Sequence, residues 1–239
     1  EYAERILSLC EESCRSINDL KNGERGNLTI GASQTIGIYL LPRVLSLAAK
    51  NYPQIHFKVQ VNSTRIIAKN LINKEIDVAI VGVEIPNDFK KNLKVETFLN
   101  DEFRLIVGKS NPFKTQQSIT KPELYDLNFI SLTANSTIRQ FIESILSQND
   151  IEPKKFKIIM ELNSIEAIKT AVSLGLGAAF VSSSAIEKEI ELKKIQIIKI
   201  ENIQIARQIF LISHLETYKS KAFQFFYNEL VRLKNNLSN

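Results

Sequence analysis

The pattern of apolar and polar positions along this chain alternates between two periods. Short apolar runs are followed by amphipathic stretches in which apolar residues recur three and four positions apart, the spacing of a helix packed on a core. In the first half we expect strands near 27–32, 55–61 and 77–81 and helices near 36–50 and 64–74. In the second half we expect strands near 127–131, 155–161 and 178–182 and helices near 136–149 and 164–174. Such an alternation predicts an α/β fold with parallel sheets.

Two segments of the chain resemble each other. VNSTRIIAKNLINKEIDVAIV (61–81) and LNSIEAIKTAVSLGLGAAFV (162–181) each read as a strand end, Asn-Ser, a helix and an apolar strand. Their separation of about 100 residues is outside the range of stacked repeats and predicts two similar lobes. The stretch VETFLNDEFRLIVGKSNP reads as two extended runs, the second leaving the first lobe at 106–112, and ARQIFLISH (206–214) brings the chain back. Two such crossings favour a hinge, and a helix over 217–234 closes the chain.

The first 22 residues are amphipathic in a different way. Ala3, Ile6, Cys10, Ser13, Ile17 and Leu20 lie alternately three and four positions apart, which is a heptad seam. A seam of this kind favours a dimerisation helix, although a face packed on its own domain would give the same spacing. Gly23 stands where a helix C-cap favours glycine.

Composition narrows the class of protein. With 44% hydrophobic residues the chain can bury a core, and no apolar run approaches the ~20 residues of a membrane-spanning helix. The net charge of +5 is spread along the chain, so this segment by itself is expected to bind DNA weakly or not at all. Cys10 and Cys14 lie one helical turn apart and far in sequence from His56 and His214, which favours a reducing compartment and no metal site.

Uncharged polar residues follow four of the predicted strands. They are Ser33-Gln34-Thr35, Asn62-Ser63-Thr64, Thr133 to Thr137, and Asn163-Ser164. Ligands of parallel α/β sheets bind at the carboxyl ends of strands, where helix N-termini offer free N–H groups. Any one junction is explained by helix capping alone.

Two arginines occupy helix first turns, where acidic residues are favoured. Arg65 and Arg139 each follow one of the polar junctions. A cation near a helix N-terminus calls for a compensating anion, so we expect a carboxylate or phosphate ligand. The alternative is that both arginines point to solvent.

Catalytic motifs are absent from the sequence. It contains no G-x-S-x-G, H-E-x-x-H or Walker motif, and Asp77 and Asp101 look isolated, the first expected to precede or cap a strand. We therefore expect no enzyme activity, no cofactor and no metal.

Several segments together resemble the LysR-type transcriptional regulators, specifically their linker helix and effector-binding domain. They are GNLTIGASQTIGIYLLPRVL, IDVAIV, LTANSTIRQFIE and EAIKTAVSLGLGAAFVS. Within that family the chain is most similar to regulators of carbon-fixation (RuBisCO) operons, including plastid-encoded ones of red algae. The resemblance implies two Rossmann-like lobes of the type 2 periplasmic-binding-protein kind, joined by two crossing strands. It places the linker helix at 1–24, lobe I at 25–107 and 208–239, and lobe II at 108–207.

The resemblance also implies partners and a site. It implies operator DNA, bound through an upstream winged helix-turn-helix that is not in this chain, and self-association into dimers and a homotetramer. It implies a small anionic metabolite between the lobes, with phosphorylated sugars, phosphoglycolate, 2-oxoglutarate and NADPH as candidates. Localisation would be the plastid (chloroplast) stroma, or otherwise a bacterial cytoplasm. The effector-contacting candidates are Ser33, Gln34, Thr35, Ser63, Thr64, Gly82, Thr133, Asn135, Ser136, Thr137 and Ser182.

One departure and one alternative remain. The loop 134–139 is bulkier than the Gly-x-Gly that more often precedes Thr-Arg in the family, which leaves the ligand's size open. A type 2 solute-binding protein of a transporter shares the two-lobed architecture, but it would carry an export signal instead of a heptad helix.

Overall fold

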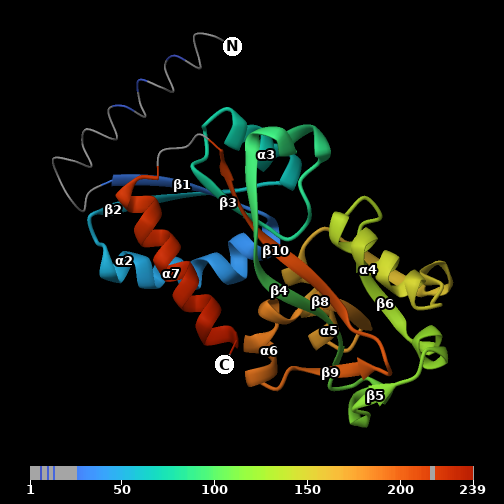
Figure 1. Ribbon diagram of the computed structural model, residues 1–239. Helices are drawn as coiled ribbons and strands as arrows, with labels where there is room; N and C mark the ends of the chain where they lie inside the picture. Colours follow the sequence, from blue (N-terminus) through green and yellow to red (C-terminus); the bar gives the residue numbers. More distant parts are fainter. Residues whose placement is uncertain (1–5, 7–9, 11–12, 14–25, 216–218, 239) are drawn as a thin grey trace. The chain divides into compact units, whose positions relative to one another are not determined.

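A computed structural model describes residues 6, 10, 13, 26–215 and 219–238 of the chain (Figure 1). The helix expected over 1–22 lies mostly outside the described residues, and within it Ile6, Cys10 and Ser13 are helical. Cys10 is exposed and is not in a disulfide. The chain forms two compact units. Unit 1 comprises the residues up to Asn100 and those from Gln208 onward, and unit 2 comprises Asp101–Arg207.

Unit 1 is built on parallel strands. Its strands are β1 (Gly26–Ala32), β2 (Ile55–Val61), β3 (Val78–Val81), the first part of β4 (Leu93–Gly108) and most of β10 (Ile205–His214). Its helices are a π-helical segment (Ile36–Leu40), α2 (Leu41–Asn51), α3 (Thr64–Ile72), a 3-10 segment (Asn87–Asn92) and α7 (Lys221–Ser238). Strand β1 pairs in parallel with β2 and β3, and β10 runs antiparallel to β3.

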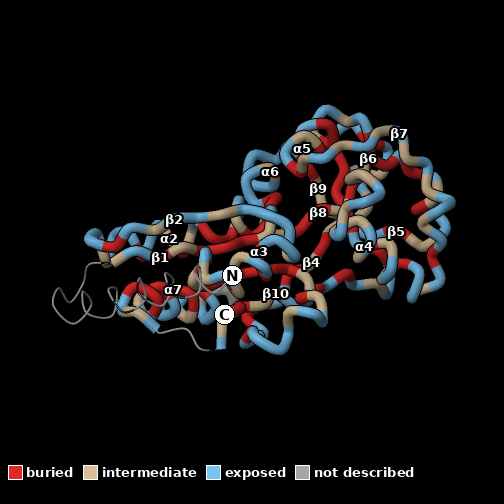
Figure 2. Tube along the Cα trace, turned by 90° about the horizontal axis from the view of Figure 1, so that it is seen from above, coloured by how far each residue is buried: buried red, intermediate tan, exposed pale blue. Residues whose placement is uncertain are grey.

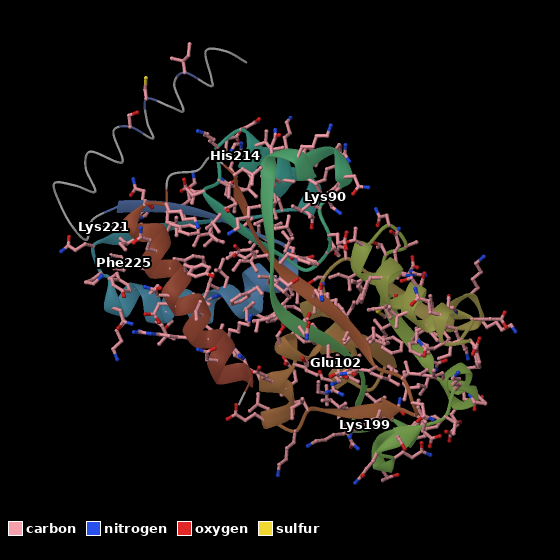
Figure 3. The ribbon with its side chains drawn as sticks, viewed as in Figure 1. Lys90, Glu102, Lys199, His214, Lys221 and Phe225 are labelled. Atoms are coloured by element: carbon pink, nitrogen blue, oxygen red, sulfur yellow. The ribbon has the colours of Figure 1, made fainter. Side chains whose placement is uncertain are left out.

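The centre of the sheet of unit 1 is buried on both faces, as in parallel sheets, whereas strand β2 is largely exposed. In β3, Val78 and Ile80 join the core formed with α2 and α7, whereas Ala79 and Val81 join the core formed with α3. The alternation follows from the two-residue period of a strand. Phe225, labelled on α7 in Figure 3, stacks on Tyr52 beyond the end of α2 with ring centroids 4.0 Å apart. Helices α2 and α7 therefore share one face.

Asp77 lies immediately before β3, as expected from the sequence. Its carboxylate accepts a 2.8 Å hydrogen bond from the Thr29 backbone N–H, and its own N–H donates to the Thr29 carbonyl at 2.9 Å. These bonds extend the pairing of β1 and β3, so Asp77 has a structural role.

Unit 2 repeats the scheme. Its strands are the rest of β4, β5 (Ser118–Ile119), β6 (Asn128–Leu132), β7 (Lys157–Leu162), β8 (Ala178–Ser182) and β9 (Ile195–Ile200). Its helices are α4 (Thr137–Gln148), α5 (Ile165–Ser173), α6 (Glu187–Glu191) and 3-10 segments at Pro112–Thr115, Pro122–Asp126, Pro153–Lys155 and Ser183–Ala185. Strand β6 pairs in parallel with β7 and β8, whereas β4 runs antiparallel to β8 and β9.

The core of unit 2 contains an aromatic stack. Phe129 of β6 stacks on Phe156 and on Phe180, with centroids 4.5 and 5.7 Å away. Buried segments follow the strands of this unit, and exposed segments form its outer loops (Figure 2).

The segment 172–177 has a steric reason for each of its two glycines. Gly175 ends α5 with φ +83°, a left-handed conformation that glycine adopts without strain. A Cβ on Gly177 would lie 2.6 Å from the backbone oxygen of Asn128, so only glycine allows this approach to β6. The two glycines turn the chain from α5 directly into β8.

The predicted α/β fold of two lobes joined by crossing strands is confirmed, with local differences. The extended runs after Leu93 form one continuous 16-residue strand, β4, instead of two runs. Strand β9 and helix α6 were not predicted, and the first turn of the first helix is π-helical. Within the described residues, no helix has both the length and the apolar character that crossing a membrane requires.

Candidate functional site

The polar junctions of unit 1 gather at one edge of its sheet. Because β1, β2 and β3 are parallel, their carboxyl ends meet at that edge. The Ser33 N–H donates to the Ile80 carbonyl at 3.2 Å, and the Asn62 N–H donates to the Ala32 carbonyl at 3.1 Å. Ser33, Ser63 and Gly82 therefore follow neighbouring strand ends.

A π-helical turn shapes the first of these junctions. The Leu41 N–H donates to the Ile36 carbonyl five residues back, so this turn is wider than an α-helical one. Pro42 follows at once; it lacks an N–H, and its ring would crowd the carbonyl four residues back, which explains the widening. A Cβ on Gly37 would lie 2.6 Å from the Val61 side chain, so this glycine lets the turn approach the end of β2.

Thr35 carries the most informative single atom of this edge. The residue is 2% exposed, and its hydroxyl has no hydrogen-bond partner among the described residues. Leaving a buried hydroxyl unpaired costs free energy, so such groups call for an explanation. Gln34 beside it is exposed and Ser33 is half-buried. The first loop thus combines an unsatisfied buried donor with two accessible polar groups.

At the second junction of unit 1, the N-terminus of α3 has no side-chain cap. Ser63 is the N-cap of α3, but its side chain makes no capping hydrogen bond. Ser63 is exposed, Thr64 is half-buried, and Gly82 at the end of β3 is buried. The first-turn N–H groups of α3 therefore have no side-chain acceptor from the cap and are available to a ligand.

The corresponding loop of unit 2 is braced from within. The Thr133 hydroxyl donates to the Asn135 side-chain oxygen at 2.8 Å, and the Ser136 N–H donates to the Thr133 carbonyl at 2.9 Å. Ser136 caps α4 by accepting from the Arg139 N–H at 3.4 Å. Asn135 and Thr137 are exposed, and Thr133 is half-buried. These internal hydrogen bonds preform the loop, and Thr137 is the exposed threonine within it.

The expectation that Arg65 and Arg139 require an external anion is wrong. Arg65 pairs with Asp88 at 3.0 Å, and Arg139 pairs with Glu143 at 2.7 Å and with Glu161. Burial alone would lower the pKa of Arg139, but hydrogen bonds to Glu143 and Glu161 outweigh burial and raise it. Carboxylates of the chain itself supply the compensating charge. The alternative that the arginines point to solvent fails for Arg139, whose side chain is 13% exposed, whereas the Arg65 side chain is 68% exposed.

Ser182 lies at the expected strand end but faces inward. It is 1% exposed, and its hydroxyl donates to Asp101 at 2.6 Å. The Asp101 carboxylate in turn accepts from Arg207 Nε at 2.9 Å, and Arg207 Nη2 lies 2.7 Å away. The view of Asp101 as isolated is therefore wrong. Burial lowers the pKa of Arg207, and the neighbouring Asp101 carboxylate partly offsets that effect.

Sequence reasoning missed this buried network. Its signal was present as Asp101, the first of two acidic residues at the start of the run DEFRLIVG, and as the arginine inside ARQIFLIS. Charged residues are rarely fully buried unless paired, so two charges in the two crossing strands were candidates for a pair.

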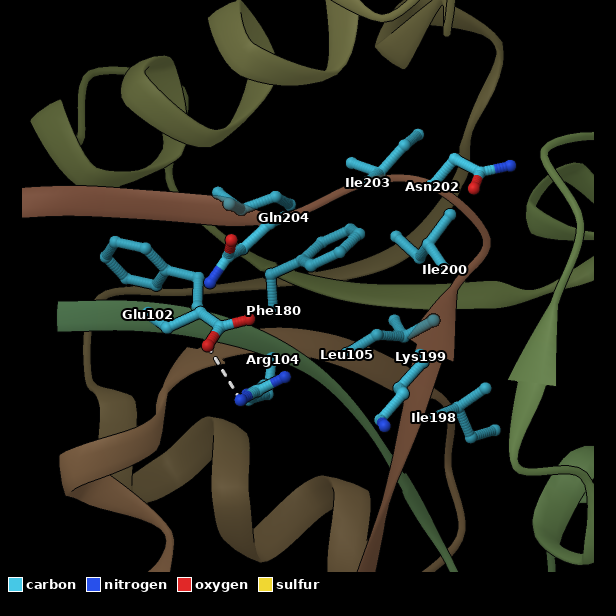
Figure 4. A pocket seen from close by; sticks show the side chains of 12 residues that line it. Glu102, Arg104, Leu105, Phe180, Ile198, Lys199, Ile200, Asn202, Ile203 and Gln204 are labelled. Carbon is cyan, nitrogen blue, oxygen red and sulfur yellow. Dashed lines mark ion pairs between the residues drawn. The ribbon is translucent and has the colours of Figure 1, made fainter. Parts of the chain in front are cut away.

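A cavity of about 410 Å³ lies elsewhere in unit 2, along β4 and the β9–β10 turn (Figure 4). Its walls include Leu105, Phe180 and Ile200, and at its border Arg104 pairs with Glu102 at 2.7 Å. None of the predicted site residues lines it. In the part of the chain that the structure describes, no three His, Cys, Asp or Glu side chains are grouped as a metal site would need.

The sequence matches the LysR substrate binding domain over residues 21–234, and the chain belongs to this family. Members of the family are regulators of transcription. A curated relative from Phaeodactylum tricornutum, named "Probable RuBisCO transcriptional regulator", is 69% identical over 239 residues, covering 100% of this chain and 78% of the relative. A relative of the same name from Porphyra purpurea is 49% identical, covering 97% of this chain and 73% of the relative. The predicted family and subgroup are confirmed.

Solved structures show the same fold. The regulatory domain of CcmR from Synechocystis PCC6803 in complex with 2-PG has a TM-score of 0.75 at 24% identity, covering 89% of this chain and 99% of that chain. The effector binding domain of QuiR in complex with shikimate has a TM-score of 0.71 at 21% identity, covering 89% and 98%. Full-length CbnR complexed with its target DNA has a TM-score of 0.73 at 17% identity, covering 98% and 80%.

Proposed function

We propose that this chain senses a small anionic metabolite for a regulator of RuBisCO genes, and that polar residues at the carboxyl ends of its parallel strands contact the metabolite. The observation that carries the proposal is the unpartnered Thr35 hydroxyl, buried at the carboxyl edge of a parallel sheet. A ligand oxygen accepting from Thr35 would satisfy a donor that the protein leaves unpaired.

The chemistry of the edges favours an anion that brings several acceptor oxygens. The first turn of α3 offers N–H groups and the positive end of a helix dipole, and the α4 loop offers Thr137. A phosphate or carboxylate suits such donors. CcmR in complex with 2-PG shares the fold, and 2-phosphoglycolate, which carries both a phosphate and a carboxylate, is our first probe.

The proposed mechanism is allosteric. A ligand that binds one conformation of the chain more tightly than another shifts the population toward that conformation, and a coupling of about 1–3 kcal/mol suffices for a useful switch. We place operator DNA binding in a segment outside this chain, and the chain spans 78% of the Phaeodactylum relative. Because the relatives come from algae, we also propose a plastid location.

Isothermal titration with 2-phosphoglycolate, 2-oxoglutarate and inorganic phosphate tests the proposal. We expect at least one of them to bind wild type, and Thr64→Ala and Thr137→Ala each to weaken that binding by about tenfold. Thr170→Ala is the matched control, because Thr170 is exposed on α5 and donates to the Glu166 carbonyl. Binding that both variants leave unchanged would move the site elsewhere.

A further inference from the structure

The first and the last residue of unit 2 are bonded to each other. Asp101, where β4 enters unit 2, pairs with Arg207, where β10 leaves it. Arg207 presents both Nε and Nη2 to the same carboxylate oxygen, at 2.9 and 2.7 Å. The pair therefore ties together the two strands that connect the units.

This pair is buried and supported on both sides. The side chains of Arg207 and Asp101 are 4% and 3% exposed. The Arg207 guanidinium lies over the Phe103 ring, 4.6 Å from its centroid, and this aromatic face fixes the plane of the arginine. Breaking a buried pair leaves an uncompensated charge, so Asp101 and Arg207 are held to one geometry.

Two serines connect the pair to the carboxyl end of β8. The Ser182 hydroxyl donates to Asp101 at 2.6 Å, and the Ser182 and Ser184 oxygens are 2.8 Å apart. An ionised carboxylate accepts only, so the Ser182 proton is used by Asp101 and the second bond needs the proton of Ser184. Ser184 is half-buried, at the edge where β6 and β8 both end.

The hydroxyl of Ser184 has one proton and two possible acceptors. Without a ligand it donates to Ser182; an anion at this edge would compete for the same proton. Losing the bond from Ser184 weakens the bond that Ser182 makes to Asp101, because hydrogen bonds in a chain polarise one another. Ligand contact at Ser184 would thus reach the crossing strands.

We propose that Ser184, Ser182, Asp101 and Arg207 form a hydrogen-bonded relay that transmits anion binding to β4 and β10. The single hydroxyl proton of Ser184 limits the relay, because either Ser182 or the anion can accept it. Ser184 is its ligand-contacting residue, and the other three are positioning residues. The relay rests on the proposed function, because it needs an anion at the carboxyl edge of unit 2.

The relay predicts effects of opposite sign for the two serines. In Ser182→Ala the competing acceptor is gone, so the Ser184 proton is free and 2-phosphoglycolate should bind about threefold more tightly. In Ser184→Ala a donor to the anion is lost, and binding should weaken by about tenfold. A merely structural role of Ser182 would weaken binding.

Titration calorimetry and hydrogen exchange of the wild-type chain, the two variants and Ser147→Ala would test this. Ser147 is exposed on α4 and donates to the Glu143 carbonyl, so its alanine variant should match wild type. In wild type, saturating 2-phosphoglycolate should change amide exchange in residues 98–103 and 205–209. In Ser182→Ala that change should vanish although the anion binds.

Each other outcome overturns a distinct claim. Weaker binding by Ser182→Ala, or an exchange response equal to that of wild type, would overturn the relay and leave the proposed function standing. Failure of wild type to bind any of the three anions tested above would overturn the proposed function and the relay with it.

Discussion

Single atoms decide much of the behaviour proposed for this domain. Thr35 and Arg207 are both nearly inaccessible to water. The Thr35 hydroxyl has no partner, whereas the Arg207 guanidinium donates from Nε to Asp101 and lies over the Phe103 ring, although its Nη2 makes no hydrogen bond among the described residues. Buried polar groups are stabilising or costly according to whether they are satisfied. The two residues therefore predict opposite responses to substitution.

Replacing Thr35 with valine removes the unpaired hydroxyl at nearly constant volume. We expect the free energy of unfolding without ligand to rise by about 1 kcal/mol, because a desolvated donor disappears. Affinity for the bound anion should fall by about tenfold. Urea unfolding and isothermal titration measure the two effects, and a less stable variant would show that the hydroxyl has a protein partner.

Replacing Arg207 with methionine leaves the Asp101 carboxylate buried without its cation. We expect a loss of about 3–5 kcal/mol in the free energy of unfolding. The double variant Asp101→Asn/Arg207→Met should recover part of that loss, because the uncompensated charge is gone. Urea unfolding of both variants checks the prediction, and equal losses would argue against a charge effect.

At the scale of elements, helix starts of similar sequence differ in their caps. Ser164 accepts a hydrogen bond from the Ala167 N–H at 3.4 Å, whereas Ser63 at the matching position of unit 1 makes no capping bond. Ser164→Ala should cost about 1 kcal/mol of stability and Ser63→Ala almost nothing. Thermal unfolding of the pair tests this, and equal costs would mean that Ser63 caps α3 in solution.

The turn between α5 and β8 depends on Gly177. A methyl group there would meet the Asn128 backbone oxygen at 2.6 Å, and a backbone oxygen cannot swing away. We expect Gly177→Ala to destabilise the protein by about 1–3 kcal/mol. Leu174→Ala, at a position 71% exposed beside the same turn, should stay within about 0.5 kcal/mol of wild type. Thermal unfolding compares the two; similar losses would contradict the steric argument.

Helices and strands with a clear periodicity of apolar residues were predictable from the sequence. Those that depend on contacts with residues distant in the sequence were not. The period-two and helical patterns predicted β2 and α3 nearly residue for residue; α3 has a buried side, whereas in β2 only Ile55 is buried. Strand β9 was missed because IQIIKI follows a charged stretch and pairs only with distant partners, β4 and β5. The π-helical turn needed knowledge of how Pro42 and Gly37 pack against their neighbours.

The candidate site was predictable in position but not in role. Parallel strand order places Ser33, Thr137 and Ser182 at carboxyl edges, as the sequence implies. Which hydroxyls are unsatisfied and which are used internally depends on long-range partners such as Asp101, 81 residues from Ser182. The internal pairing of Arg139 with Glu161 was hidden for the same reason. Contact of the site residues with a ligand stays a prediction.

At the scale of the whole molecule, the resemblance implies self-association. The heptad positions of residues 1–22 and the family both favour dimers or larger assemblies. We expect multi-angle light scattering at tens of micromolar to give a mass at least twice the 27.2 kDa of one chain. Deleting residues 1–22 should lower that mass. A strict monomer would count against the assembly.

The wide turn at Ile36–Leu40 couples the direction of the polar loop before it to the packing of the core. Removing one residue there would rewind the turn to α-helical geometry and rotate Ser33, Gln34 and Thr35 by about 100° relative to α2. Ile36 and Leu40 belong to the core together with Leu41 and Val44, so the same deletion would displace core side chains. A change of length in this turn would therefore alter what the loop recognises only together with a rearrangement of the core beneath it.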